Sequence, residues 1–303
     1  MLTPFGIEVR KQRLDKGMRL LDMADAMNKT AAFLSSVETG RKPIPDGFVD
    51  EAADALSASP EERAALVAAA DRTRREVKVG NLAGQDRELV AAFARKLGNQ
   101  EQLNPGDLDT LKKLILKSRQ GEKPFRRRRG MLVKPLDTLK IWEYSEMVRS
   151  AFVPDDVIAF PIMDVLEFRL AEHFPGFYVD VCTAQELGDD EGQVIPGRNL
   201  IKLREDVYRR AWDGVGRDRF TACHEFAHYL MHREIPMSRM VPSTDYPIYR
   251  DAEWQADVFA GALLMSSRHA RRFESPHDMA DMCGVSDLAA EVQWANYRKK
   301  GKI

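Results

Sequence analysis

The first 75 residues carry apolar positions at the spacing of short amphipathic helices. Two successive apolar stripes are formed by Leu20, Leu21, Met23, Ala24 and Met27, and then by Phe33, Leu34 and Val37. Thr30 is a good N-cap for the helix that carries the second stripe, and Gly40 is well placed to end it. The pattern predicts an all-helical N-terminal domain over residues 1–75.

Residues 76–130 are less regular, although two further helices are expected, one around 90–97 and one from Pro105 onward. Glycine and proline then surround four successive arginines, Arg126–Arg129. This composition is typical of a linker, and a charge run in a linker is expected to be solvated. We therefore predict a helical linker region over residues 76–130.

From Met131 onward, helical and alternating patterns follow one another, which indicates an α+β domain over residues 131–303. Strands are predicted at 177–181 and 199–203, where polar and apolar residues alternate. Helices are predicted over 141–152, after the turn at 214–216, around 253 and from about 278. The whole chain is therefore expected to be α+β and mostly helical.

The composition of the chain indicates how it could bind nucleic acid and in which compartment it works. The net charge is −1, so any binding to nucleic acid must come from a local patch and not from the overall field. The three cysteines match no CxxC pattern, which argues for a reducing compartment. Neither a signal peptide nor a membrane-spanning segment is predicted. We expect a cytoplasmic protein.

An HExxH motif, formed by His224-Glu225-Phe226-Ala227-His228, lies within an apolar helical segment. Positions i and i+4 share one face of a helix, so both imidazoles are aimed at one point. Zinc accepts imidazole nitrogen readily. Glu225 would lie beside the metal, where a carboxylate can take a proton from the activated water and later deliver it to a leaving amine. The motif predicts a zinc peptidase with Glu225 as general base.

A catalytic zinc needs three protein ligands and one open position. We predict Glu253 as the third ligand, because it follows His228 by 25 positions on a helix whose small residues allow a close approach. Asp257, one turn further, is predicted to accept the second ring N–H of a ligand histidine. His232 would close the site as a fourth ligand, so a supporting or structural role is predicted for it. Cys223 is expected to be buried, and the remaining histidines are expected at the surface: His173, His269 and His277.

Three segments, 201–208, 219–232 and 253–265, resemble the ImmA/IrrE family of metallo-endopeptidases, and the resemblance covers about residues 135–300. It implies a zincin-like domain of the gluzincin type. It implies zinc ligands and a general base at His224, His228, Glu253 and Glu225. Many members cleave a DNA-bound repressor and so switch on stress or mobile-element genes. One departure is Ser266, where a proline usually follows Leu-Leu-Met.

The pattern from Phe5 to Leu56 resembles the XRE (Cro/C1-type) helix-turn-helix, whose second helix enters the major groove. That helix would begin near Thr30 and expose its first residues. The predicted DNA contacts are Lys29, Thr30, Ala31, Ser35, Arg41 and Lys42, with Arg10, Lys11 and Arg13 as further phosphate contacts. Ala31 and Ala32 cannot hydrogen-bond to bases, and Leu20 stands where a phosphate-contacting glutamine is usual. The alternative is a helix-turn-helix kept for protein interaction or dimerisation.

Together these patterns predict a zinc-dependent endopeptidase coupled to a DNA-binding domain, with a repressor as its protein substrate. Pairing into a homodimer would suit the reading of two half-sites. The alternative is a non-catalytic DNA-binding regulator or antitoxin-like protein whose peptidase fold binds without turnover. A protein freed from catalysis has no chemical need for Glu225, which favours the peptidase. A third hypothesis is that the peptidase cuts its own linker near Arg126.

Overall fold

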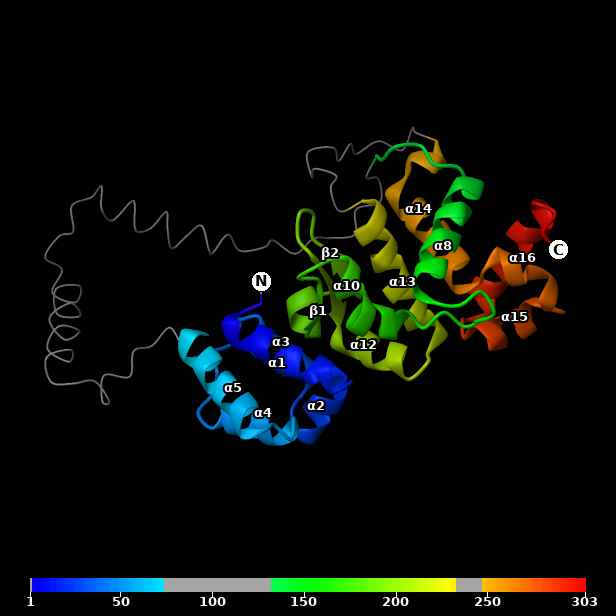
Figure 1. Cartoon of the computed structure of the whole chain (residues 1–303). Helices are drawn as coiled ribbons and strands as arrows, with labels where there is room; N and C mark the ends of the chain where they lie inside the picture. The colour runs from blue at the N-terminus through cyan, green and yellow to red at the C-terminus, as the bar shows by residue number, and fades with distance from the viewer. Residues whose placement is uncertain (1, 74–131, 233–246) are drawn as a thin grey trace, which may run out of the picture.

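The computed structural model describes residues 2–73, 132–232 and 247–303. The two helices expected between 76 and 130 and the arginine run of the linker lie outside these ranges. The described residues form an α+β fold that is mostly helical, as predicted (Figure 1). None of the helices in these ranges combines the length and the apolar character that crossing a membrane requires.

The N-terminal domain is built from short helices: α1 (Pro4–Asp15), α2 (Leu20–Ala26), α3 (Ala31–Glu38), α4 (Phe48–Ala55) and α5 (Pro60–Thr73). Thr30 is the N-cap of α3 as predicted, because its hydroxyl accepts a hydrogen bond from the amide of Phe33. Gly40 follows the end of α3 with a φ of +72°, a conformation that favours glycine. The pair α2 and α3 forms the helix-turn-helix.

The rest of the described chain contains α8 (Thr138–Phe152), α9 (Ile162–Asp164), the π-helical turn η2 (Val165–Arg169), α10 (Leu170–His173), β1 (Tyr178–Cys182), α11 (Ala184–Leu187), β2 (Gly192–Val194), β3 (Leu200–Arg204), α12 (Glu205–Trp212), α13 (Gly216–Met231), η4 (Ile248–Arg250), α14 (Ala252–Leu264), η5 (Ser267–Arg272), α15 (Pro276–Cys283) and α16 (Asp287–Lys299). The two predicted strands and the predicted helices of this part are confirmed within a few residues. Strand β2 was not expected, because three residues that begin with glycine carry too little alternation to be recognised.

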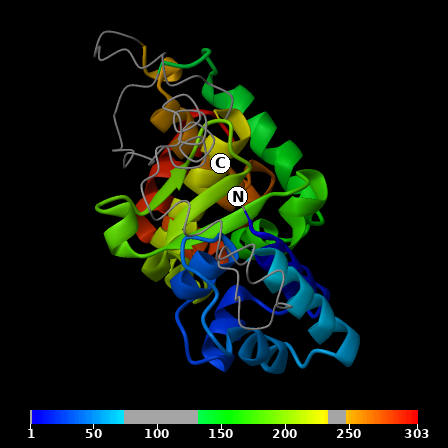
Figure 2. The same ribbon diagram turned by 90° about the vertical axis from the view of Figure 1, so that its left-hand side faces the viewer.

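The strands form one sheet in the order β1-β3-β2. β1 runs parallel to β3, with Tyr178 opposite Leu200, and β2 runs antiparallel to β3, with Gly192 opposite Leu203. β1 and β2 are therefore the two edges of this sheet. Helix α13 packs on β3 and β2, and α14 and α8 form further layers beyond α13. The N-terminal helices lie at the β1 side of the sheet (Figures 1 and 2).

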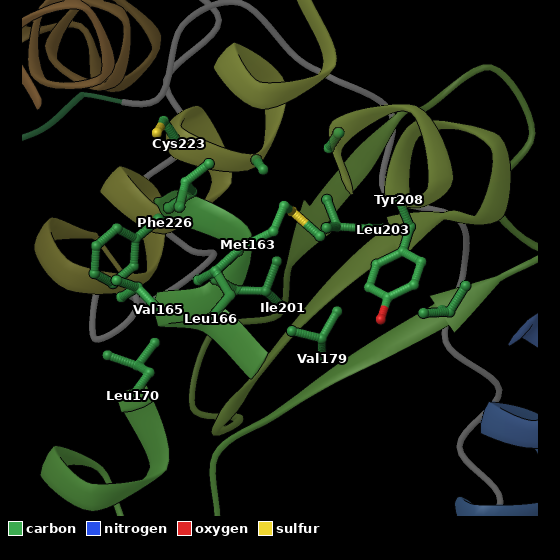
Figure 3. Packing of buried hydrophobic residues seen from close by; sticks show 14 of the residues in the cluster. Met163, Val165, Leu166, Leu170, Val179, Ile201, Leu203, Tyr208, Cys223 and Phe226 are labelled. Atoms are coloured by element: carbon green, nitrogen blue, oxygen red, sulfur yellow. The ribbon is translucent and has the colours of Figure 1, made fainter. Parts of the chain in front are cut away.

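A buried apolar core holds α13 against the sheet. Figure 3 shows Met163, Leu166, Ile201 and Phe226 gathered between the strands and the helices, and all are at most 4% exposed. Cys223 on α13 is fully buried, as predicted, and it carries a free thiol like the other two cysteines. Dense packing of this kind leaves the helix little freedom to move. The core therefore gives α13 a fixed orientation.

The turn after α14 departs from expectation at one residue. Ser266 caps η5 by accepting a hydrogen bond from the amide of Arg268, and its hydroxyl donates to Glu146 on α8. The amide of Ser267 donates to the same carboxylate at 2.9 Å. Because these bonds fold η5 onto α8, His269 is only 3% exposed, and its predicted surface position is wrong. Proline at 266 could not provide this cap.

Candidate metal centre

Helix α13 presents His224 and His228 on one face, as the spacing of the HExxH motif requires. Their Nε2 atoms lie 3.0 Å apart, and the residues are 6% and 9% exposed. Glu225 lies between them in sequence and is 4% exposed. It lies next to strand β2, since a Cβ added to Gly192 would come within 2.5 Å of the Cγ of Glu225.

The first turn of α14 supplies the third group. Asp251 caps this helix, because its Oδ1 accepts from the amides of Glu253 at 2.8 Å and Trp254 at 3.1 Å. The Oε2 of Glu253 lies 3.1 Å from the Nε2 of His224, and its Oε1 lies 3.3 Å from the Nε2 of His228. Small, fully buried residues such as Ala256 allow α14 to approach α13 this closely.

The three groups fit a zinc ion. Their ligand atoms all lie within 4.8 Å of one another. Tetrahedral zinc holds nitrogen and oxygen ligands at about 2.0–2.2 Å, which places them about 3.3 Å apart. The two Nε2 atoms lie 3.0 Å apart, and each lies 3.1 or 3.3 Å from one of the two oxygens of Glu253, which is close to that value. Two imidazole nitrogens and one carboxylate are also the donor set of a three-ligand catalytic zinc site.

Asp257 orients the first histidine. Its Oδ1 lies 2.8 Å from the Nδ1 of His224, so that nitrogen carries the proton and Nε2 faces Glu253. Burial opposes the charged imidazole, but hydrogen bonds to Asp257 and Glu253 outweigh it and raise the pKa of His224 to about 10. Burial raises the pKa of the Glu253 carboxyl, but hydrogen bonds to His224 and His228 outweigh it and hold this pKa well below its usual range. A metal must therefore displace a proton from His224, and its affinity falls as pH falls.

A hydrogen-bonded chain orients the second histidine. The Nε2 of Gln255 donates to the carbonyls of Lys134 and Tyr249, both at 2.8 Å, so its Oε1 faces the Nε2 of His232 at 3.1 Å. His232 must donate from Nε2, and its Nδ1 is left to accept from the Nδ1 of His228 at 3.0 Å. Burial, and then the neighbouring His228, lower the pKa of His232 to about 3, which keeps this ring neutral. The Nδ1 of His228 is thus engaged with His232, and its Nε2 is the nitrogen that faces the centre.

The hydrogen bonds from Gln255 through His232 to His228 predict a measurable role for His232. His232→Phe removes the acceptor for the His228 ring N–H and is expected to weaken zinc binding by about 10- to 100-fold. His232→Asn, whose side-chain oxygen can take the place of Nδ1, should recover part of that loss. Competition with a chromophoric chelator measures both affinities, with the exposed His277→Phe as control. Equal affinities in the parent and His232→Phe would reduce His232 to a packing role.

The predicted DNA contacts fall into two groups. Lys29, Thr30 and Lys42 are exposed. Ala31 is fully buried and Ser35 is 2% exposed, so the prediction that the start of this helix is exposed is wrong for these residues and for Ala32. The reason is that α3 packs on β1, and a helix face covered by another domain leaves no signature in helical periodicity.

The predicted phosphate contacts at Arg10 and Arg13 are also wrong in this arrangement. They are 7% and 1% exposed, and Arg13 forms an ion pair with Glu167 at 2.5 Å. Arg41 is paired as well, with Asp180 at 2.8 Å. Lys11 and Lys42 are exposed, and neither has a described ion pair. Arg13 and Arg41, two of the charges expected to face phosphates, are thus engaged by carboxylates of the same chain.

Sequence reasoning missed two parts of the centre. One is Gly192, whose lack of a side chain leaves room for Glu225, and a glycine beginning a short strand was its single signal. The other is Gln255, whose role depends on two backbone carbonyls that no spacing rule brings together. Gly192 adjoins Glu225, and Gln255 acts through His232 on His228 of the motif.

Comparison with known proteins finds two family models that match separate parts of the chain. A family model described as an IrrE N-terminal-like domain, of a peptidase family, matches residues 190–293. A second model, described as a helix-turn-helix domain, matches residues 4–66. No curated protein and no solved structure matches the chain significantly. The peptidase match begins just before β2 and includes His224, His228 and Glu253.

Proposed function

Because a helix-turn-helix domain joined to an IrrE N-terminal-like peptidase domain is the architecture of the ImmA/IrrE family, we propose that this protein is a zinc-dependent endopeptidase. Its proposed substrate is a regulatory protein, a transcriptional repressor of stress or mobile-element genes. One observation carries the proposal: His224, His228 and Glu253 converge on one point with Glu225 beside them. A reducing cytoplasm suits the three free cysteines.

Each residue of the centre is proposed to have a separate role in peptide hydrolysis. Zinc, when bound by His224, His228 and Glu253, would supply a Lewis acid and lower the pKa of water. Glu225 would accept the proton of the attacking water on its carboxylate and pass it to the leaving amine. The burial of Glu225 limits its exchange of protons with bulk water. Asp257 and His232 would hold the two imidazoles in the orientation that binding requires.

Strand β2 provides a place for the substrate. It pairs with β3 on one side, and no strand of the described residues pairs with its other side. A peptide in extended conformation can add to such an edge through backbone hydrogen bonds. Gly192 lies on this strand beside Glu225. A peptide bound along β2 would therefore pass close to the general base.

Gly192→Ala tests the contact between β2 and the base. The added Cβ would meet the Cγ of Glu225 at 2.5 Å, so the carboxylate has to move. Because a misplacement of about 1 Å can cost about 100-fold in rate, we expect kcat to fall by about tenfold or more. Zinc content should stay at the parental level. Steady-state cleavage assays with Gln193→Ala as the neighbouring control measure the effect, and an unchanged kcat would contradict the proposed position of Glu225.

The proposed function is tested with the product of the neighbouring gene, if that gene encodes a repressor. The purified full chain is incubated with this repressor and one equivalent of zinc, and intact masses are followed. The proposal expects two repressor fragments and no change in the mass of the chain itself. Fragments of the chain instead would support cleavage of its own linker. An intact repressor and an intact chain at full zinc loading would support the non-catalytic regulator.

A further inference from the structure

The helix that reads DNA in helix-turn-helix modules, α3, lies against the outer edge of the peptidase sheet (Figure 2). The hydroxyl of Ser35 donates to Asp180 Oδ1 at 2.8 Å and accepts from the amide of Val181 at 3.0 Å. Val181 belongs to β1, an edge strand, so Ser35 satisfies a backbone donor that faces away from β3. The short side chains of Ala31 and Ala32, both fully buried, allow this close approach.

Carboxylates of the peptidase domain meet the groups that such a module offers to phosphates. The amide of Ala32, in the first turn of α3, donates to Glu205 Oε1 at 3.1 Å. Helix N-termini of this kind bind phosphate in DNA complexes. Arg41 pairs with Asp180 Oδ2 at 2.8 Å and also lies 3.4 Å from Glu186. The carboxylates of Glu205 and Asp180 therefore lie where phosphate oxygens of a bound duplex would be expected.

A second set of contacts extends the same interface along α1 and the start of α2. Glu167 pairs with Arg13 and also accepts from the amide of Leu20 at 2.7 Å. Its other oxygen accepts from the hydroxyl of Tyr208, and Arg10 donates to its backbone carbonyl at 3.3 Å. Leu20 begins the first helix of the helix-turn-helix, the position at which these modules contact the DNA backbone. One carboxylate thus binds a basic side chain and a helix N-terminus together.

We infer that the peptidase domain carries an acidic docking surface, formed by Glu167, Asp180 and Glu205, that holds the helix-turn-helix domain in the place of DNA. Docking and duplex binding use the same groups, the α3 N-terminus, Ser35 and the arginines. They are therefore mutually exclusive, and the chain as described is in its closed, DNA-free arrangement. Binding of a duplex through α3 requires release of the docking surface, which reduces the apparent affinity by the fraction of chains that are open.

The inference is tested on the full chain with Asp180→Arg, which sets a cation against Arg41. Asp189→Arg, at an exposed position, makes the same change in charge away from the interface. A second variant, Asp180→Ala with Glu205→Ala, removes two acceptors without adding a cation. Release is read from hydrogen exchange at the amide of Val181, and duplex affinity from fluorescence polarisation with a mixed-sequence DNA duplex.

We expect both interface variants to exchange faster at Val181 and to bind the duplex about tenfold or more tightly than the parent and the Asp189→Arg control. Added duplex should also speed exchange at Val181 in the parent. Faster exchange without tighter binding would overturn the inference. So would tight binding by the parent with Val181 still protected, because DNA would then contact another surface. Protection of Val181 in both variants would show that these carboxylates do not hold α3.

Discussion

Glu225→Gln is expected to slow peptide hydrolysis by about 10²- to 10⁴-fold, the usual contribution of a general base. Glutamine has nearly the same shape as glutamate, so it should fit between α13 and Gly192 without displacing either. Its amide cannot accept the proton of the attacking water. Because Glu225 is not one of the three converging ligands, the zinc content should remain at one equivalent.

The measurement pairs cleavage rates with elemental analysis of the same samples. Glu172→Gln makes the identical chemical change at an exposed position outside the centre and should keep the parental rate. A Glu225→Gln protein that cleaves as fast as the parent would show that another group takes the proton. A variant that loses its zinc would show instead that Glu225 supports the metal.

His224→Ala is expected to have the largest effect on metal binding. Loss of a residue that merely supports a ligand costs about 10- to 100-fold in affinity, so loss of the ligand itself should exceed about 100-fold. The variant also leaves Glu253 and Asp257 without the imidazole that lies between them at 3.1 and 2.8 Å. Elemental analysis after dialysis should find close to one zinc per chain in the parent and almost none in the variant.

His277→Ala is the matched control, because that imidazole is exposed and bonded to Asp287 on the surface. It should retain the parental zinc content. Undiminished zinc in His224→Ala would refute the ligand assignment. Glu253→Ala should lose zinc as His224→Ala does. Asp257→Asn should weaken zinc affinity without abolishing it, because Asp257 contacts the ligand His224 and is not itself a ligand.

The helical period was enough to predict which side chains share a face at the centre. The i and i+4 rule places His224 with His228, and Glu253 with Asp257, whatever the rest of the fold does. It could not predict how the two helices cross, which brings Glu253 within 3.3 Å of both imidazoles. That crossing depends on the small residues of α14, such as Ala256, which were the signal in the sequence that the two helices approach closely.

Features that depend on contacts distant in sequence were predicted poorly. The pattern in Ala31 and Ser35 is that of a helix with small residues on one face, which suits a DNA groove or a sheet edge equally. Asp180, which decides between them here, lies 145 positions from Ser35. His269 is predicted at the surface, whereas the hydrogen bonds of Ser266 to Glu146 on α8 lead to its burial, and no local pattern in the sequence signals them.

X-ray absorption at the zinc edge tests the central claim most directly. On the zinc-loaded full chain, the account predicts a four-coordinate ion with two imidazoles and only nitrogen and oxygen neighbours, at about 2.0–2.2 Å. The imidazole signal should fall to one ring in His228→Ala if that variant keeps any metal. A sulfur neighbour at about 2.3 Å, or a shell of oxygens without imidazole, would contradict the assignment to His224, His228 and Glu253.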